Sequence, residues 1–131
     1  MEIIKISLKS LVKLDNITLC LIDFDSLKSD YSILINKSKN LGQKVGVLFT
    51  VSNNEQIDNI IELFERLKTD YFFILEEDVL NISIESFVNE LLIPLGVTNV
   101  VCEPNYHFIY NKKIDSDSLS YYEEFDTYVC D

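Results

Sequence analysis

The residues best suited to binding or catalysis lie in one acidic turn. An apolar run, Ile17–Ile22, ends at Asp23 and Asp25, and Asp30 follows shortly after. Three carboxylates at the end of a strand could hold Mg²⁺ through their oxygens and through water. The competing interpretation is a solvated acidic loop in which Asp23 or Asp25 helps to cap a helix, and we favour it over a metal site. Lys28, in the same turn, is either a phosphate ligand or an exposed residue of the first helical turn.

The other reactive side chains are a single histidine and three cysteines. His107 is a residue type often used as an acid or base. No partner nucleophile or base is visible for it, and the alternation across Tyr106–Tyr110 places it on the polar face of a strand. Cys20 and Cys102 sit inside apolar runs, and the three cysteines, Cys130 included, lack the spacing of metal ligands. We therefore interpret all three as reduced residues of the core.

Aromatic residues gather in the last quarter of the chain. They are Tyr106, Phe108, Tyr110, Tyr121, Tyr122, Phe125 and Tyr128. Aromatic rings stack well on planar ligands, so this group could line a flavin pocket. A C-terminal helix and strand packed against a sheet would explain the same residues, and we favour that interpretation.

Strands alternate with helices along the whole chain. We expect strands at 2–8, 17–22, 44–50, 71–75, 98–102 and 127–130, with a further extended segment at 106–110. We expect helices from Ser26 to about residue 40, from Asn53 or Asn54 to about 68, from 84 to about 92, and over 118–125, after a polar stretch at 111–117. Ser83 is the expected cap of the third helix, and Pro94 and Gly96 its end.

This order of elements predicts an α/β domain with a mostly parallel sheet of five or six strands, right-handed crossovers and helices on both faces. In such a sheet, the turn from a strand to the next helix commonly binds phosphates or nucleotides. The acidic turn after Ile22 is a turn of this kind. It is therefore our first candidate for a binding site.

The composition and charge of the chain limit the kinds of partner that it is expected to bind. The chain has 131 residues, 47% of them hydrophobic, as expected of a single domain spanning 1–131. No apolar run approaches the roughly 20 residues of a membrane span, and the alternating first ten residues resemble an edge strand, not a signal peptide, so we expect a cytoplasmic protein. A net charge of −11 argues against nucleic acid and membrane surfaces as partners. A nucleotide would have to arrive with its metal ion.

Three segments carry a resemblance to a known family. Residues 22–31 align with the family motif G-N-F-D-G-V-H-x-G-H. Residues 63–87 align with a family segment that reads L-x-x-L-x-x-D, an apolar strand, an acidic turn and S-x-x-x-F. Residues 103–109 align with the family motif G-x-D-F-R-F-G. From about Thr18 to Val129 the chain thus resembles the FAD synthetase (FMN adenylyltransferase) domain of bacterial riboflavin-metabolism proteins, in the nucleotidyltransferase superfamily.

The resemblance implies a Rossmann-like nucleotidyltransferase fold with FMN, FAD or ATP with Mg²⁺ as ligands. The nucleotide-binding residues that it implies are Phe24, Asp25, Lys28 and Tyr31. The flavin-side loop that it implies is formed by Asn105, Tyr106, His107 and Phe108.

The chain departs from the family at the residues that perform the chemistry. Lys28, Asp30 and Tyr31 stand where the family has H-x-G-H, whose histidines stabilise the phosphates during transfer. Ile22 replaces the opening glycine, and His107 replaces the arginine of the third motif. The family's S-S-T-x-x-R motif and the riboflavin kinase domain have no counterpart in these residues. Lys28 is the one weak catalytic candidate.

Three functional hypotheses follow. The first is an FAD-synthetase-like protein with impaired or lost catalysis that retains flavin or adenine nucleotide binding. The second is a structural or interaction module, for example a homodimer, with no small-molecule ligand. The third is an active nucleotidyltransferase with an altered site in which Lys28 and acidic residues bind the metal-bound nucleotide.

Overall fold

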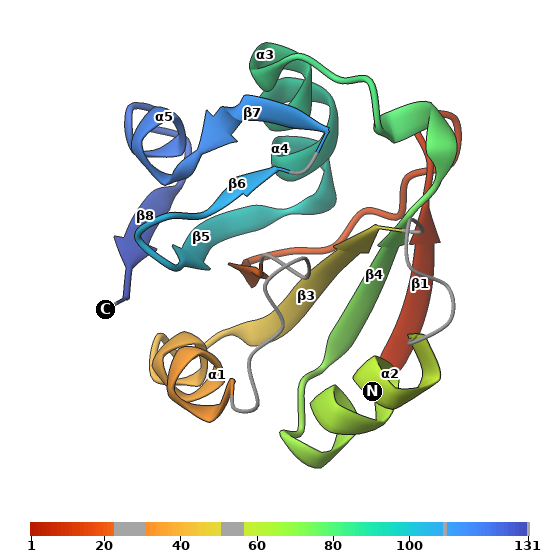
Figure 1. Ribbon diagram of the computed structural model, residues 1–131, viewed down its shortest axis with the longest axis vertical. Coiled ribbons are helices and arrows are strands. Elements are labelled where there is room, and N and C mark those ends of the chain that lie inside the picture. The colour runs from red at the N-terminus through yellow and green to blue at the C-terminus, as the bar shows by residue number, and fades with distance from the viewer. Residues whose placement is uncertain (23–30, 51–56, 109, 131) are drawn as a thin grey trace.

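Six strands form one parallel sheet at the centre of the structure (Figure 1). The computed structural model describes residues 1–22, 31–50, 57–108 and 110–130. Across the sheet the order is β1-β4-β3-β2-β5-β8. The strands are β1 (Glu2–Ile6), β2 (Ile17–Leu21), β3 (Lys44–Thr50), β4 (Tyr71–Leu75), β5 (Val97–Cys102) and β8 (Asp126–Val129). The predicted Rossmann-like α/β fold is confirmed, and β1 is an edge strand as expected.

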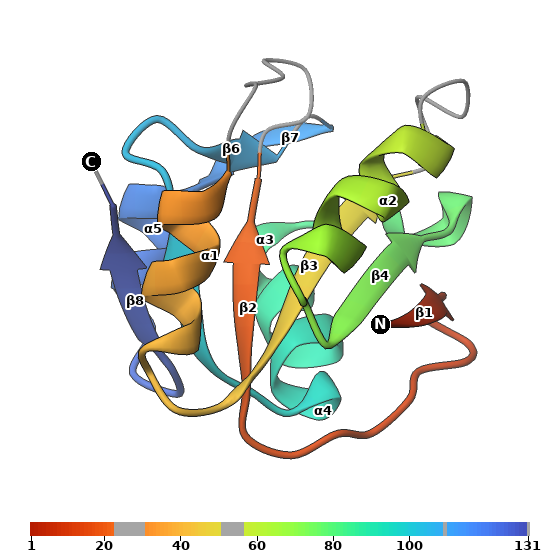
Figure 2. The same cartoon turned by 90° about the horizontal axis from the view of Figure 1, so that it is seen from below.

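Helices cover both faces of this sheet (Figure 2). One face carries α1 (Ser32–Lys39) and α2 (Ile57–Arg66). The other carries a continuous run of α3 (Ile84–Ser86), a π-helical segment η3 (Phe87–Leu92) and α4 (Ile93–Leu95), together with α5 (Ser116–Ser120). A 3₁₀ turn, η2 (Glu77–Val79), follows β4, and a small antiparallel ladder joins β6 (His107–Phe108) to β7 (Asn111–Asp115).

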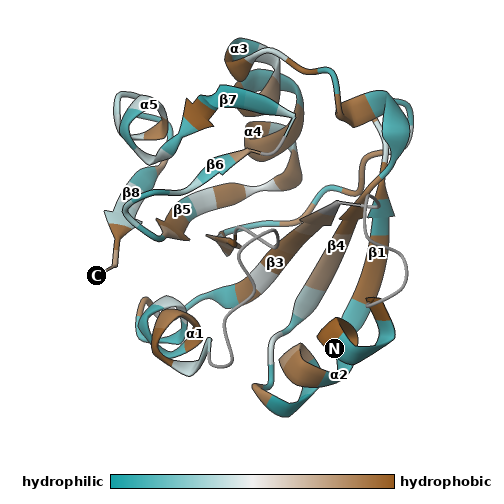
Figure 3. Ribbon diagram, in the orientation of Figure 1, coloured by the Kyte–Doolittle hydropathy of each residue, from teal (hydrophilic) through white to brown (hydrophobic). Residues whose placement is uncertain are grey.

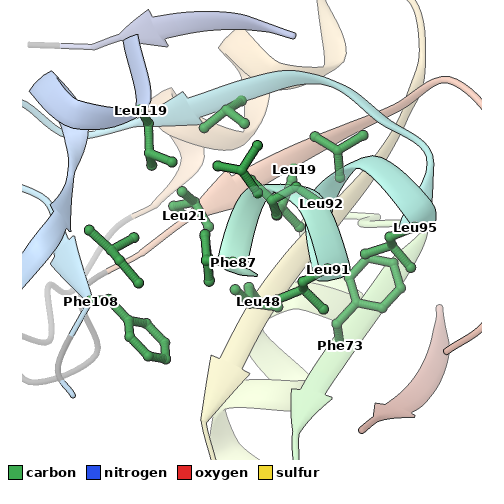
Figure 4. Packing of buried hydrophobic residues seen from close by; sticks show 14 of the residues in the cluster. Leu19, Leu21, Leu48, Phe73, Phe87, Leu91, Leu92, Leu95, Phe108 and Leu119 are labelled. Carbon is green, nitrogen blue, oxygen red and sulfur yellow. The ribbon is translucent and has the colours of Figure 1, made fainter. Parts of the chain in front are cut away.

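Alternation along the strands separates the core into two layers. Successive side chains of a strand point to opposite faces, so Leu19 and Leu21 of β2 pack beneath η3, whereas Cys20 and Ile22 pack beneath α1. Because both faces are covered, β2, β3 and β4 are apolar along most of their length (Figure 3). Figure 4 shows the η3 layer, where Phe73 and Phe87 fill the space between sheet and helix.

A polar cluster joins the amino ends of the central strands. The Oε1 of Gln43 accepts hydrogen bonds from Thr98 Oγ1 at 2.9 Å, from Asn99 Nδ2 at 2.9 Å and from Thr18 Oγ1 at 3.2 Å. Thr18 is fully buried, so its hydroxyl needs a partner inside the protein. One amide oxygen therefore satisfies polar groups of both β2 and β5.

The first predicted helix begins later than expected. We expected it to start after Ser26, a residue that lies outside the described ones, but α1 begins at Ser32 with Tyr31 at the N-cap position. The ring of Tyr31 is buried against Phe64, with centroids 5.7 Å apart, so the helix starts where this side chain enters the core. Asn53 and Asn54, the predicted caps of the second helix, also lie outside the described residues.

The third helix passes through Pro94, which we expected to end it. Its start is as predicted, because Ser83 Oγ accepts the N–H of Ser86 at 3.2 Å. A prolyl ring clashes with the carbonyl four residues earlier in an α-helix. The wider π-helical turn before Pro94 relieves this clash. The helix ends at Gly96, whose left-handed backbone, with φ of 96°, strongly favours glycine.

The segment after β5 differs most from the prediction. Residues 111–115, expected to be a polar loop, form strand β7, and α5 ends at Ser120 instead of near residue 125. Ile114 is the one buried residue of β7, so the strand lacks the repeated apolar pattern on which the prediction relied. Asp115 explains where α5 begins, because its Oδ1 accepts the N–H of Ser118 at 2.8 Å.

Candidate functional site

The strand order of the sheet reverses between β2 and β5. From β2 the chain proceeds to β3 and β4 on one side, and then crosses to β5 on the other side of β2. The carboxyl ends of the two strands lie together, since Leu21 pairs with Cys102 in the sheet register. In open parallel sheets ligands bind outside the carboxyl ends of the strands at such a switch point. The loop after β5, beside the carboxyl end of β2, is therefore the candidate site.

The loop after β5 is held in place by the start of α5. Within the loop, the N–H of Tyr106 donates to Glu103 O at 3.1 Å. Ser116 then bonds to the loop twice: its Oγ donates to Pro104 O at 2.8 Å, and its N–H donates to Tyr106 O at 3.2 Å. Ser116 is itself buried. Because these bonds join the loop to a helix, it has a defined shape at the edge of the sheet.

A cavity of about 310 Å³ opens between this loop and the β7–α5 junction. Its lining consists of Pro104, Asn105, Tyr106, His107, Lys112, Asp115, Ser116 and Asp117. The charged groups are mixed, with Lys112 opposing Asp115 and Asp117. Hydrogen bonds from the hydroxyl and the backbone N–H of Ser118 lower the pKa of Asp115, so this carboxylate is charged at neutral pH. Two carboxylates against one lysine disfavour an isolated phosphate at this site.

The predicted flavin-side residues divide between the cavity and the core. Asn105 is exposed and His107 is half-buried, with the His107 Nδ1 3.3 Å from Asn105 O. Tyr106 lines the cavity but is only 5% exposed. Phe108 points away into the η3 layer, where its ring centroid lies 5.5 Å from that of Phe87. The structure thus brings Asn105, Tyr106 and His107 together and places Phe108 elsewhere.

The predicted nucleotide-side residues lie mostly beyond what the structure describes. Phe24, Asp25 and Lys28 are outside the described residues, as are Asp23 and Asp30 of the same turn.

The two ends of that turn belong to the core. Tyr31, a predicted nucleotide ligand, is only 3% exposed and packs against Phe64. Ile22, which replaces the family's glycine, is 5% exposed in the α1 layer. The predicted role of Tyr31 in nucleotide binding stays a prediction.

The aromatic residues do not form one pocket. Tyr106, Phe108 and Phe125 are buried in the η3 layer, whereas Tyr121 is 85% exposed. Tyr128 lies on the opposite face, under Lys37 Nζ at 5.8 Å from the ring centroid. The interpretation that these rings pack the C-terminal elements against the sheet is confirmed for the buried ones.

Cys20 and Cys102 are buried, as predicted, whereas Cys130, also predicted to lie in the core, is only partly buried beside the α1 layer. None of the three cysteines is in a disulfide within the described residues. Burial raises the pKa of the Cys102 thiol to about 12 and that of Cys20 further still, so neither supplies a thiolate at neutral pH. Within the described ranges, no three His, Cys, Asp or Glu residues gather into a metal site. No helix in the same ranges is long and apolar enough to cross a membrane.

Five lining residues were not among the predicted site residues: Pro104, Lys112, Asp115, Ser116 and Asp117. Lys112 and Asp117 are exposed polar residues of a type found on any surface, so the sequence offers no signal for them. Asp115 carried one, because aspartate is a favoured N-cap residue. This signal would have placed the start of α5, and hence the cavity wall, correctly.

Comparisons with known proteins bear on the fold. No family model matches the chain, and no curated protein matches it. Among solved structures, it is similar to the macrolide-efflux protein from Streptococcus pneumoniae, with a TM-score of 0.81 and 12% identity. The match covers 100% of this chain and 58% of that one, so this chain spans little more than half the length of its structural neighbour. At this identity the likeness shows the shared α/β fold alone.

Proposed function

We propose that this protein is an FAD-synthetase-like member of the nucleotidyltransferase superfamily that binds a flavin or an adenine nucleotide and has little or no adenylyl transfer activity. The observation that carries the proposal is the position of the cavity. It lies beside the carboxyl end of β5, next to the switch point, and is lined by part of the loop that the family resemblance assigns to the flavin.

Electrostatics and packing support impaired catalysis. Adenylyl transfer places negative charge on phosphate oxygens, and each preorganised donor that stabilises it is typically worth about 2.7–4 kcal/mol. The positions of the family's histidines hold Lys28 and Tyr31, and Tyr31 is buried. Ile22 fills core space where the family has a glycine. The loss of several donors together leaves too little stabilisation for efficient transfer.

A binding panel tests the proposal directly. Calorimetric titration with FMN, FAD and ATP, each with Mg²⁺, is expected to give saturable binding for at least one ligand. Asn105→Ala, at an exposed residue of the cavity, should weaken that binding. Asn89→Ala removes an exposed amide from η3, away from the cavity, and should leave binding unchanged. A flat panel for all three ligands would refute the proposal.

Pyrophosphate release from ATP in the presence of FMN measures the catalytic part separately. We expect release close to background. Turnover well above background would instead support the active nucleotidyltransferase with an altered site. In that case, a Lys28→Ala variant with full activity would exclude the phosphate-binding role of Lys28.

A second candidate function is an interaction module without a small-molecule ligand. One observation favours it: Tyr31, Tyr106 and Phe108, all expected to contact ligand, are at most 5% exposed. A family pocket would then be filled by the protein's own side chains. If the protein is an interaction module, it should self-associate or bind a partner protein that a pull-down recovers. A monomer in sedimentation at high protein concentration would exclude a homodimer.

A further inference from the structure

The outer edge of the sheet at β8 presents unused backbone groups. Among the described residues β8 pairs with β5 alone, and beyond its end the N–H of Cys130 still donates to Cys102 O at 2.8 Å. Backbone groups of successive strand residues point to alternate edges. Thr127 and Val129, which alternate with the residues bonded to β5, therefore direct their N–H and C=O groups away from the sheet. Figure 2 shows β8 as the last strand on that side.

This edge strand is short, at four residues, but it lacks several other features that protect edge strands from pairing. Natural proteins protect them with proline, lysine or β-bulges. β8 contains neither proline nor lysine, and its register with β5 shows no shift. A hollow of about 580 Å³ lies beside it, lined in part by Glu123, Asp126 and Thr127. A further extended segment thus has both backbone partners and space.

Charge identifies the kind of segment that fits. Residues 120–130 include Glu123, Glu124 and Asp126 and contain no lysine or arginine. The whole chain carries a net charge of −11, so a second copy of the protein would be repelled from this edge. A basic segment would be attracted to it, and its side chains could reach these carboxylates.

We propose that the β8 edge binds an extended, lysine- or arginine-rich peptide segment of a partner protein, which adds a strand beside Thr127 and Val129. Main-chain hydrogen bonds provide the pairing, as in other cases of strand addition. The acidic residues around β8 select for basic side chains. This surface is distinct from the cavity at the β5 loop, and the proposal does not depend on flavin or nucleotide binding.

The probe is a fluorescein-labelled peptide in which lysine alternates with valine or threonine. Fluorescence anisotropy with the full chain is expected to show saturable binding that weakens as salt is added. The same peptide N-methylated at every backbone nitrogen keeps its charge but loses the N–H groups of both edges. Its affinity should fall by roughly tenfold or more, because each lost main-chain hydrogen bond is worth about 1 kcal/mol.

A pair of proline variants tests the position of the surface. Val129→Pro removes an outward N–H from β8. Ile3→Pro is the matched control on the opposite edge: both residues are β-branched and 46% exposed. The N–H of Ile3 also points outward, because the neighbouring Glu2 donates to Asp70 of the adjoining segment at 2.9 Å. Val129→Pro should weaken peptide binding roughly fivefold, and Ile3→Pro by less than about twofold.

Several results would overturn the proposal. They are a flat anisotropy titration, equal affinity for the N-methylated peptide, equal effects of the two proline variants, or a sedimenting dimer that excludes the peptide. If Val129→Pro does not fold by circular dichroism, the comparison of the two peptides on the unaltered protein still decides whether backbone pairing occurs.

Discussion

A glycine in β3 gives the sharpest stability prediction. Gly46 pairs with Tyr71 across the β3–β4 ladder, and the ring of Phe73 lies over it. A Cβ atom at Gly46 would be 2.3 Å from Phe73 Cε2, 3.1 Å from Cδ2 and 3.3 Å from Cζ. The ring cannot turn aside easily, because Phe73 is fully buried and stacks on Tyr71 with centroids 5.6 Å apart.

Two opposing effects set the expected cost of Gly46→Ala. Forcing a methyl group into a packed core costs about 1–3 kcal/mol. Replacing glycine with alanine also restricts the unfolded chain, which stabilises the folded state by about 0.4–1 kcal/mol. The overpacking term is larger, so we expect a net loss of about 1–2 kcal/mol in the free energy of unfolding. Urea denaturation measures it as a lower midpoint with an unchanged slope.

A double-mutant cycle tests the cause as well as the size of this loss. In a Phe73→Leu background the smaller side chain leaves room for the methyl group, so Gly46→Ala should become neutral or stabilising. Phe72→Leu is the matched control, because Phe72 is equally buried but faces the α1 layer. There the cost should persist. Equal costs in all three backgrounds would refute the steric argument.

Three further predictions concern the polar groups and the thiols. Gln43→Ala should lower the free energy of unfolding by about 1–3 kcal/mol in urea titrations, because it removes the acceptor shared by the two central strands. Asp115→Ala should lower the free energy of unfolding by about 1 kcal/mol at neutral pH, because it removes the helix cap. Folding lowers the pKa of Asp115 from 3.8. The difference in stability between the variant and the unaltered protein should therefore disappear as the pH falls through 3.8 and then through the lower folded value. Iodoacetamide followed by mass spectrometry should modify Cys130 in the folded protein and the two buried cysteines only after unfolding.

The sheet could be predicted from the sequence because strand burial leaves a strong pattern. β3 and β4 have the predicted bounds, since fully covered strands are continuous apolar runs between polar turns. β7 could not be predicted in this way, because it is stabilised by pairing with a two-residue strand and by one buried side chain, Ile114. Pairing between short polar strands depends on the tertiary fold and leaves little trace in the local sequence.

The third helix shows a different limit. Proline normally marks the end of a helix, and Pro94 was assigned that role. The wider π-helical turn that precedes it depends on how Phe87, Leu91 and Leu92 pack into the core, where all three are fully buried. Tertiary packing thus overrides a local rule at Pro94. The stop at Gly96 has a local cause, its left-handed backbone with φ of 96°, and a tertiary cause as well, since a Cβ there would lie 1.9 Å from the Leu14 carbonyl oxygen.

The candidate site shows why not every residue of a consecutive sequence motif can belong to a binding surface. Asn105, Tyr106, His107 and Phe108 were assigned together to the flavin because they share one family segment. Asn105 lies in a turn and is exposed, and His107 is half-buried, whereas the rings of Tyr106 and Phe108 are buried. Substitutions at the two buried rings would unfold the loop and lower ligand binding whatever their role. Only Asn105 and His107 can distinguish ligand contact from loss of structure, which is why the binding experiment relies on Asn105.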